Sequence, residues 1–172
     1  MSSGLTARFA ACYNLLGAER RRPLTSQQPT TEVEKKTLPI VAYLHLPESA
    51  DEEPYLWGNK CISCGAVYVG SRMACSRCTS QQLDRVRFSN SGEIWTFGVV
   101  HQSIPGVPTP YVAAIVDLPE GASVRATVTG LDPNQPGPSW FGRKVQMYIE
   151  KAYTDKQGND IITYKYRPVE GS

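Results

Sequence analysis

The sequence predicts a mainly β protein with three parts in chain order. An extended, partly helical N-terminal arm comes first, then a small cysteine-rich ribbon, and then a small antiparallel barrel or sandwich. Two observations lead to this prediction. Four of the five cysteines form two C-x2-C pairs that are separated by ten residues. After these pairs come six short segments rich in β-branched and alternating apolar residues, with Gly, Pro and Asn between them and no convincing helical pattern.

Length and charge narrow the class of protein. The chain has 172 residues, which is enough for one ordinary domain, or a small one with an appendage, and excludes a large two-domain enzyme. Its 18 Lys and Arg residues against 16 Asp and Glu residues give a net charge of +2, so charge alone does not favour nucleic-acid binding. No stretch approaches the roughly 18 to 20 apolar residues of a membrane span. We expect a soluble, cytoplasmic protein.

Residues 1–54 are the first of three expected regions, an arm that ends in a docking segment. A mitochondrial presequence would be basic and poor in acids, and Glu19, Gly4 and Gly17 weaken that interpretation of the arginine-containing start. A secretory signal fits worse, because its apolar core runs for about 7 to 15 residues. The ribbon is expected at 55–82 and the barrel at 83–172.

The docking segment is the apolar stretch 38–46, which three prolines in and after it prevent from forming a long helix. It must pack on the body of the protein or on another protein, and we favour the second. Aromatic residues beside the ribbon and in a barrel loop can anchor the same interface. The expected partner interface comprises Leu38, Ile40, Val41, Tyr43, Leu44, Tyr55, Trp57, Trp140 and Phe141. The alternative for the tryptophans is packing in the chain's own core, which we favour for Trp95.

The barrel strands are expected where apolar alternation is strongest. They are residues 83–88, 93–102, 111–117, 123–130, 144–153 and 161–166. The connections between them contain Gly, Pro, Asn and Asp, which are turn residues. The longest, 132–142, lies where many five-stranded Greek-key barrels place a helix or an extended loop.

The cysteine pairs have the ligand spacing of a zinc site. Each C-x2-C turn lets two thiolates converge on one ion, and a short hairpin between the turns completes the tetrahedron. Gly65 allows the positive φ of a tight turn around sulfur, and Val67 and Tyr68 can cover the site. Four cysteine ligands leave no coordination position for water or substrate. We therefore expect one structural Zn²⁺, held by Cys61, Cys64, Cys75 and Cys78.

Two other interpretations of the four cysteines remain. Disulfides persist in oxidising compartments, and nothing in the sequence directs export. A C-x2-C pair can also be a dithiol catalyst, but no helical pattern follows here to activate the first thiol.

A basic cluster accompanies the ribbon. Between residues 60 and 87, five Lys and Arg residues face one acid, Asp84. The cluster is either a solvated face or an anion site for the phosphates of a nucleotide-bearing ligand or of nucleic acid. The residues expected at such a site, with CoA as one ligand, are Lys60, Arg72, Arg85 and Arg87.

Five segments of the chain, in this order, carry a resemblance to a known family: PYLWGNKCISCG, CSRCTS, SGEIWTFGVV, PYVAAIVDLPEG and KVQMYIEKAYTDKQGNDIITYKYRPV. Over residues 54–169 the sequence resembles the DUF35 family of acyl-CoA-associated proteins. The resemblance implies a rubredoxin-like zinc ribbon formed by the four cysteines, a five-stranded OB-fold barrel, and a place beside thiolases, hydratases or other acyl-CoA enzymes. The chain looks most like thiolase-associated members, such as the small subunit of benzoylsuccinyl-CoA thiolase.

No catalytic constellation is evident in the chain itself. A thiolase needs a reactive Cys with His and a second Cys, whereas four cysteines here are committed to metal and Cys12 lies in the arm. His45 and His101 have no evident partner. We expect a noncatalytic subunit that stabilises a thiolase or other acyl-CoA enzyme, in aromatic-compound degradation by CoA-thioester β-oxidation, and contributes to acyl-CoA binding.

The alternative is a nucleic-acid module, a common use of zinc ribbons and OB-folds. Single-strand binding by an OB face needs aromatic residues interleaved with basic ones. Residues 111–117 and 123–129 supply one Tyr and one Arg. We therefore favour the accessory subunit.

Overall fold

The computed structural model describes residues 35–49 and 51–169, which belong to the compact unit Val33–Ser172. Residues 1–34 of the expected region 1–54, with the helical character of the arm and Cys12, lie outside the described residues. The described part is mainly β, with one 3-10 turn, η1 (Pro138–Trp140). Within it, no helix is long and apolar enough to span a membrane.

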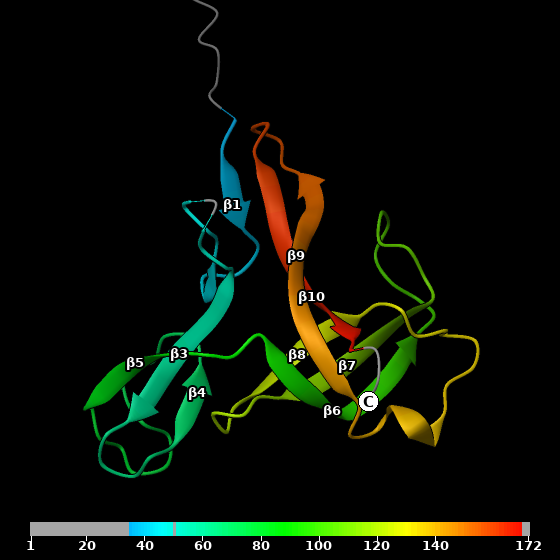
Figure 1. Cartoon of the computed structure of the whole chain (residues 1–172). Helices are drawn as coiled ribbons and strands as arrows, with labels where there is room; N and C mark the ends of the chain where they lie inside the picture. The colour runs from blue at the N-terminus through cyan, green and yellow to red at the C-terminus, as the bar shows by residue number, and fades with distance from the viewer. Residues whose placement is uncertain (1–34, 50, 170–172) are drawn as a thin grey trace, which may run out of the picture. The chain divides into compact units, whose positions relative to one another are not determined.

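Five strands close into a barrel (Figure 1). They are β6 (Ser91–Val100), β7 (Tyr111–Asp117), β8 (Ser123–Val128), β9 (Lys144–Thr154) and β10 (Asp160–Pro168). The pairing runs β10-β8-β7-β6-β9, and β9 pairs with β10 to complete the ring. Only the β8–β10 pair is parallel among these five. The predicted five-stranded OB-fold is confirmed, with expected strand bounds that differ from the observed ones by a few residues.

The ribbon sheet is centred on β3 (Tyr55–Cys61). β3 pairs antiparallel with three strands, which are β5 (Leu83–Arg87), β2 (Leu44–His45) and β4 (Val67–Val69). We expected residues 83–88 to open the barrel. They extend the ribbon instead, because convergence of the two cysteine pairs returns the chain beside β3, where Cys61 pairs with Leu83.

The apolar segment before the ribbon packs in part on the chain itself, which corrects our expectation for its buried residue Leu44, whereas Leu38 and Ile40 are exposed. Its first part is β1 (Thr37–Pro39), which pairs parallel with β10 (Figure 1). The Ile40 amide then donates to the Ile162 carbonyl at 2.8 Å. Leu44 is only 2% exposed and is part of the core.

Ribbon and barrel contribute to one apolar core cluster. From the ribbon sheet and its exit come the buried side chains of Leu44, Leu56 and Phe88, which join barrel residues such as Ile94 and Tyr166. Full burial of one such side chain stabilises the fold by about 1.5–3 kcal/mol. The inner face of the ribbon sheet is therefore covered, and its outer face is the one left for other contacts.

Two tryptophans lie opposite to where the sequence suggested. Trp140 is 6% exposed and packs on Phe97, with ring centroids 4.8 Å apart. Trp95 is 65% exposed, because its neighbour Ile94 points into the core and successive strand side chains alternate. A β-bulge between Ile94 and Thr96 makes Trp95 the extra residue of β6.

Candidate metal centre

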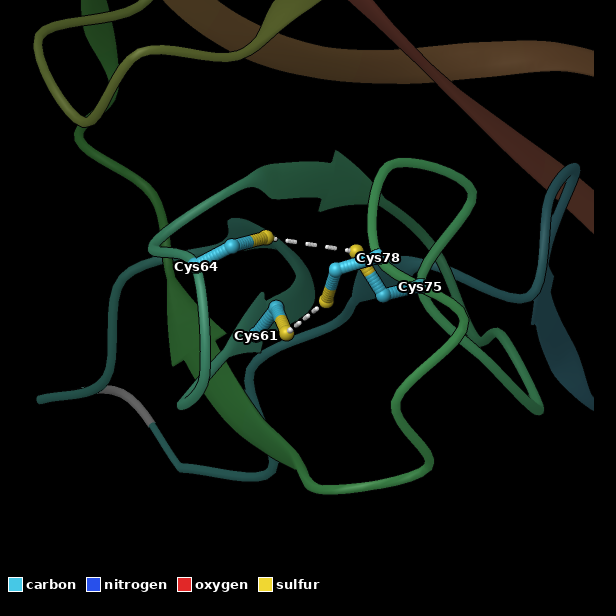
Figure 2. A group of neighbouring side chains, drawn as sticks. All are labelled: Cys61, Cys64, Cys75 and Cys78. Atoms are coloured by element: carbon cyan, nitrogen blue, oxygen red, sulfur yellow. Dashed lines mark hydrogen bonds between the residues drawn. The ribbon is translucent and has the colours of Figure 1, made fainter.

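The four cysteine side chains of the two C-x2-C pairs point toward one another from the two turns of the ribbon (Figure 2). All four Sγ atoms lie within 4.8 Å of one another, and the Cys61–Cys78 and Cys64–Cys75 pairs are 3.5 Å apart. A tetrahedral zinc with Zn–S bonds near 2.3 Å requires sulfurs about 3.8 Å apart. None of these four cysteines forms a disulfide, so all four sulfurs are available as ligands. Their number and their spacing fit Zn²⁺.

The two turns are built alike, although their sequences differ after the second cysteine. In the first, the Cys61 amide donates to the Ala66 carbonyl at 2.8 Å and the Gly65 amide donates to the Cys61 carbonyl at 2.9 Å. The second repeats both bonds at the same lengths, from Cys75 to Ser80 and from Thr79 to Cys75. Gly65 has φ 72° and Thr79 has φ 60°, so each turn ends in a left-handed residue.

Cys75 sits in an environment that favours its thiolate, the form that binds metal. The Tyr68 hydroxyl donates to Cys75 Sγ at 3.3 Å, and it accepts a hydrogen bond from the Ser76 hydroxyl at 3.0 Å. The Arg77 amide also donates to this sulfur, at 3.4 Å. The hydrogen bond from Tyr68 is the main reason that the pKa of the Cys75 thiol falls from 9.0 to about 6. Tyr68 thus covers the site as expected.

Burial is graded across the four cysteines. Cys61 and Cys75 are buried, Cys64 is half-buried and Cys78 is exposed. Four protein sulfurs satisfy a tetrahedral ion completely, which is the arrangement of structural rather than catalytic zinc.

The predicted anion residues do not all meet. Arg85 and Arg87 on β5 lie over the rings of Trp57 and Tyr55 on β3, each 4.2 Å from the ring centroid. Lys60 is the cross-strand partner of Asp84, whereas Arg85 is the partner of the preceding residue, Asn59. Successive side chains along a strand point to opposite faces of the sheet. Lys60 therefore lies on the other face of the sheet.

Arg72 joins the face that carries Arg85 and Arg87. Its guanidinium lies 4.6 Å from the centroid of the Tyr68 ring, and its backbone amide donates to Asn59 Oδ1 at 2.8 Å. Tyr68 and Asn59 are cross-strand partners in β4 and β3. The alternation in the segments YLWGNKC and LDRVR could have predicted that Arg85 and Arg87 share a face with Tyr55 and Trp57.

The predicted interface residues are spread over several environments. Leu44 and Trp140 are buried in the core, which removes them from the side chains that a partner can reach. Val41, Tyr43, Tyr55 and Trp57 are half-buried, and Leu38, Ile40 and Phe141 are exposed.

A hollow on β6, β7 and β8 is lined by Thr96, Phe97, Gly98, Ala113, Ala114, Ile115 and Arg125. One aromatic and one basic residue do not make an interleaved stacking surface.

Comparisons with known proteins agree with this fold. The family of the ChsH2 C-terminal OB-fold domain matches residues 85–150. The structure is similar to a solved chain titled Ltp2-ChsH2(DUF35) aldolase, with a TM-score of 0.52, 25% identity, and coverage of 66% of this chain and 84% of that one.

Two curated relatives extend the similarity beyond the barrel. A DUF35 domain-containing scaffold protein of Methanothermobacter thermautotrophicus is 31% identical over 135 residues, which are 75% of this chain and 95% of the relative. The benzoylsuccinyl-CoA thiolase subunit BbsA of Thauera aromatica is 27% identical over 150 residues, 85% of this chain and 100% of that subunit. With the OB-fold barrel, the clustered cysteines and a relative matched over nearly its whole length, this chain belongs to the DUF35 family.

Proposed function

We propose that this chain is a noncatalytic accessory subunit that binds and stabilises an acyl-CoA enzyme, with a thiolase as the first candidate. The observation that carries the proposal is the match to BbsA, a relative that is named as a thiolase subunit and is covered over 100% of its length. The similar solved chain is likewise named together with an enzyme, an aldolase. A contribution to acyl-CoA binding and a role in aromatic-compound degradation stay predictions.

One structural Zn²⁺ held by the four cysteines is part of the proposal. The fit of the sulfur spacing and the hydrogen bonds to Cys75 support it. The ion would join the two turns of a ribbon too small to fold on its own core.

The reactive groups of the described residues are already engaged or lack the partners that thiolase chemistry needs. All cysteines between residues 35 and 169 lie in the four-sulfur cluster. His45 Nε2 lies 2.7 Å from Glu52 Oε1, where it shares a hydrogen bond, and His101 is exposed. This supports the noncatalytic part of the proposal.

The proposal is tested by recovering the full chain, tagged at its own gene, from its native host and quantifying the proteins that stay with it through gel filtration. We expect an acyl-CoA enzyme, a thiolase first of all, in a fixed ratio to this chain. Tagging that enzyme and recovering this chain is the control. A stable, monodisperse chain that elutes alone would contradict the proposal.

A further inference from the structure

The outer face of the ribbon sheet carries six aromatic and arginine side chains. We call it the Arg–aromatic face, and it consists of Tyr55, Trp57, Tyr68, Arg72, Arg85 and Arg87. Strand alternation places these residues opposite the side chains of Leu56 and Val86, which pack on the core. The face therefore has no covering element among the ribbon strands.

The arginines are held in place by the rings beneath them. Guanidinium–ring distances of 4.2, 4.2 and 4.6 Å are those of cation–π contacts, each worth about 0.5–1 kcal/mol at an exposed site. The Trp57 ring is itself fixed, because its Nε1 donates to the Ala42 carbonyl at 3.1 Å. His45 stacks on Tyr55 with centroids 4.4 Å apart. The rings thus favour these guanidinium positions before any partner binds.

No carboxylate of the described residues forms an ion pair with these arginines. The ion pairs formed between described residues use Lys35, His45, Lys151 and Lys165, and none uses Arg72, Arg85 or Arg87. The acid nearest in the sheet, Asp84, lies on the other face. Glu52 bonds the Glu48 amide at 3.0 Å and His45 at 2.7 Å, and these two bonds, followed by the more distant charge of Arg87, lower the pKa of its carboxyl.

We infer that the Arg–aromatic face is the surface that docks the enzyme subunit proposed above, and that this subunit presents Asp or Glu carboxylates to Arg85 and Arg87. The inference rests on the proposed function. Trp, Tyr and Arg dominate the energetics of protein interfaces, and an ordered guanidinium binds a carboxylate through two parallel hydrogen bonds. Desolvating the rings against the partner strengthens both effects.

The spacing of the arginines favours separate carboxylates over a phosphate. Arg85 and Arg87 are two residues apart on one strand, so they are about 7 Å apart along it, and their guanidinium groups lie over two different rings. Nucleic acid is disfavoured because guanidinium groups already lie over the rings on which bases would stack. The acyl-CoA phosphates and single-stranded DNA are therefore rival ligands in the test.

The test measures the affinity of the purified full chain for the enzyme recovered with it. The variant carries Arg85→Glu and Arg87→Glu, and the matched control carries Arg167→Glu. Arg167 lies 5.7 Å from the Tyr148 ring centroid on the barrel hairpin, so the control reverses a similar charge elsewhere. We expect the double variant to weaken binding by about 100-fold or more and the control to leave it unchanged.

A second variant keeps the test valid if charge reversal disturbs folding. Arg85→Lys with Arg87→Lys keeps the charge but loses the planar fork, so we expect a loss of about 10-fold with unchanged zinc content. Wild-type binding that weakens with added salt supports the inference. Equal binding by all variants would overturn the inference and leave the accessory function standing, whereas a wild-type chain with no partner would overturn both. Displacement of the enzyme by CoA or single-stranded DNA, with binding of that ligand lost in the double variant, would also overturn it.

Discussion

Gly65 and Thr79 close the two cysteine turns in the same left-handed conformation, and they differ in what that conformation costs. A Cβ at Gly65 would meet no atom within 4 Å, so the cost of a side chain there is purely conformational. We predict that Gly65→Ala lowers the free energy of unfolding of the zinc-loaded protein by about 1 kcal/mol. Urea unfolding measures this. Gly65→Asn is the control and should lose less, because Asn tolerates this conformation; equal stability of all three proteins would refute the account.

Tyr68 supports the metal site through a single hydrogen bond to a ligand sulfur. Tyr68→Phe removes the donor to Cys75 Sγ, so the pKa of this thiol should rise toward 9.0 and protons should compete better with zinc. We predict a loss of zinc affinity of about 10- to 100-fold, measured by competition with a chelator. Tyr148→Phe, which removes a hydroxyl 2.9 Å from the Thr129 hydroxyl in the barrel, should leave the affinity unchanged. Zinc affinity equal to that of the wild type in Tyr68→Phe would show that the bond is unimportant.

At the residue scale, local spacing predicted more than sequence proximity did. The four cysteines were predicted because both turns are short and self-contained. Lys60 was grouped wrongly with Arg85 and Arg87, because closeness in the sequence does not give the face of a strand. The prediction that Trp95 packs in the core was wrong for a related reason, since a large aromatic residue on a strand points outward when its neighbour points inward.

At the scale of elements, Asp160 ties the barrel hairpin to the chain before β1. Its carboxylate lies 2.6 Å from Lys151 Nζ and 2.9 Å from Lys35 Nζ. The hydrogen bond with Lys151, followed by that with Lys35, lowers the pKa of Asp160 from 3.8 to about 2. The carboxylate is therefore stabilised in the folded state.

Because the folded pKa of Asp160 is depressed, its contribution to stability is complete above about pH 4 and is lost as the pH falls through about 2. We predict that the protection of the Ile40 amide, which bonds to β10, falls across this window when its exchange is compared with the intrinsic rate at each pH. Asp160→Asn should show reduced protection of this amide already at neutral pH, with no further change attributable to this group on acidification. Protection at Ile40 that is the same in both proteins would contradict the prediction.

The barrel strands were predictable because each carries its own alternation and its own turn residues. The pairing of β5 was not predictable in this way, because it depends on the return of the chain through the second cysteine turn. The short β1 contains a proline and pairs with β10 at the far end of the sequence. Nothing local in three residues indicates such a partner.

At the scale of the whole molecule, ribbon and barrel share one core but differ in what holds them. The barrel is closed by strand pairing, whereas the ribbon depends on joining its two cysteine turns. We predict that chelation of zinc lowers the unfolding temperature and exposes the Cys61 and Cys75 amides to exchange, while the barrel amides stay protected. Adding zinc back should restore the original protection. An unfolding temperature that does not respond to chelator would contradict a structural metal.

We propose that a zinc-bearing chain without catalytic residues of its own acts by joining an acyl-CoA enzyme. Native mass spectrometry of the complex recovered from the host tests both parts in one measurement. We expect a defined hetero-oligomer with this chain and the enzyme in fixed ratio, and one zinc for each copy of this chain. A free chain without zinc, or a zinc-loaded chain that forms no complex, would contradict it.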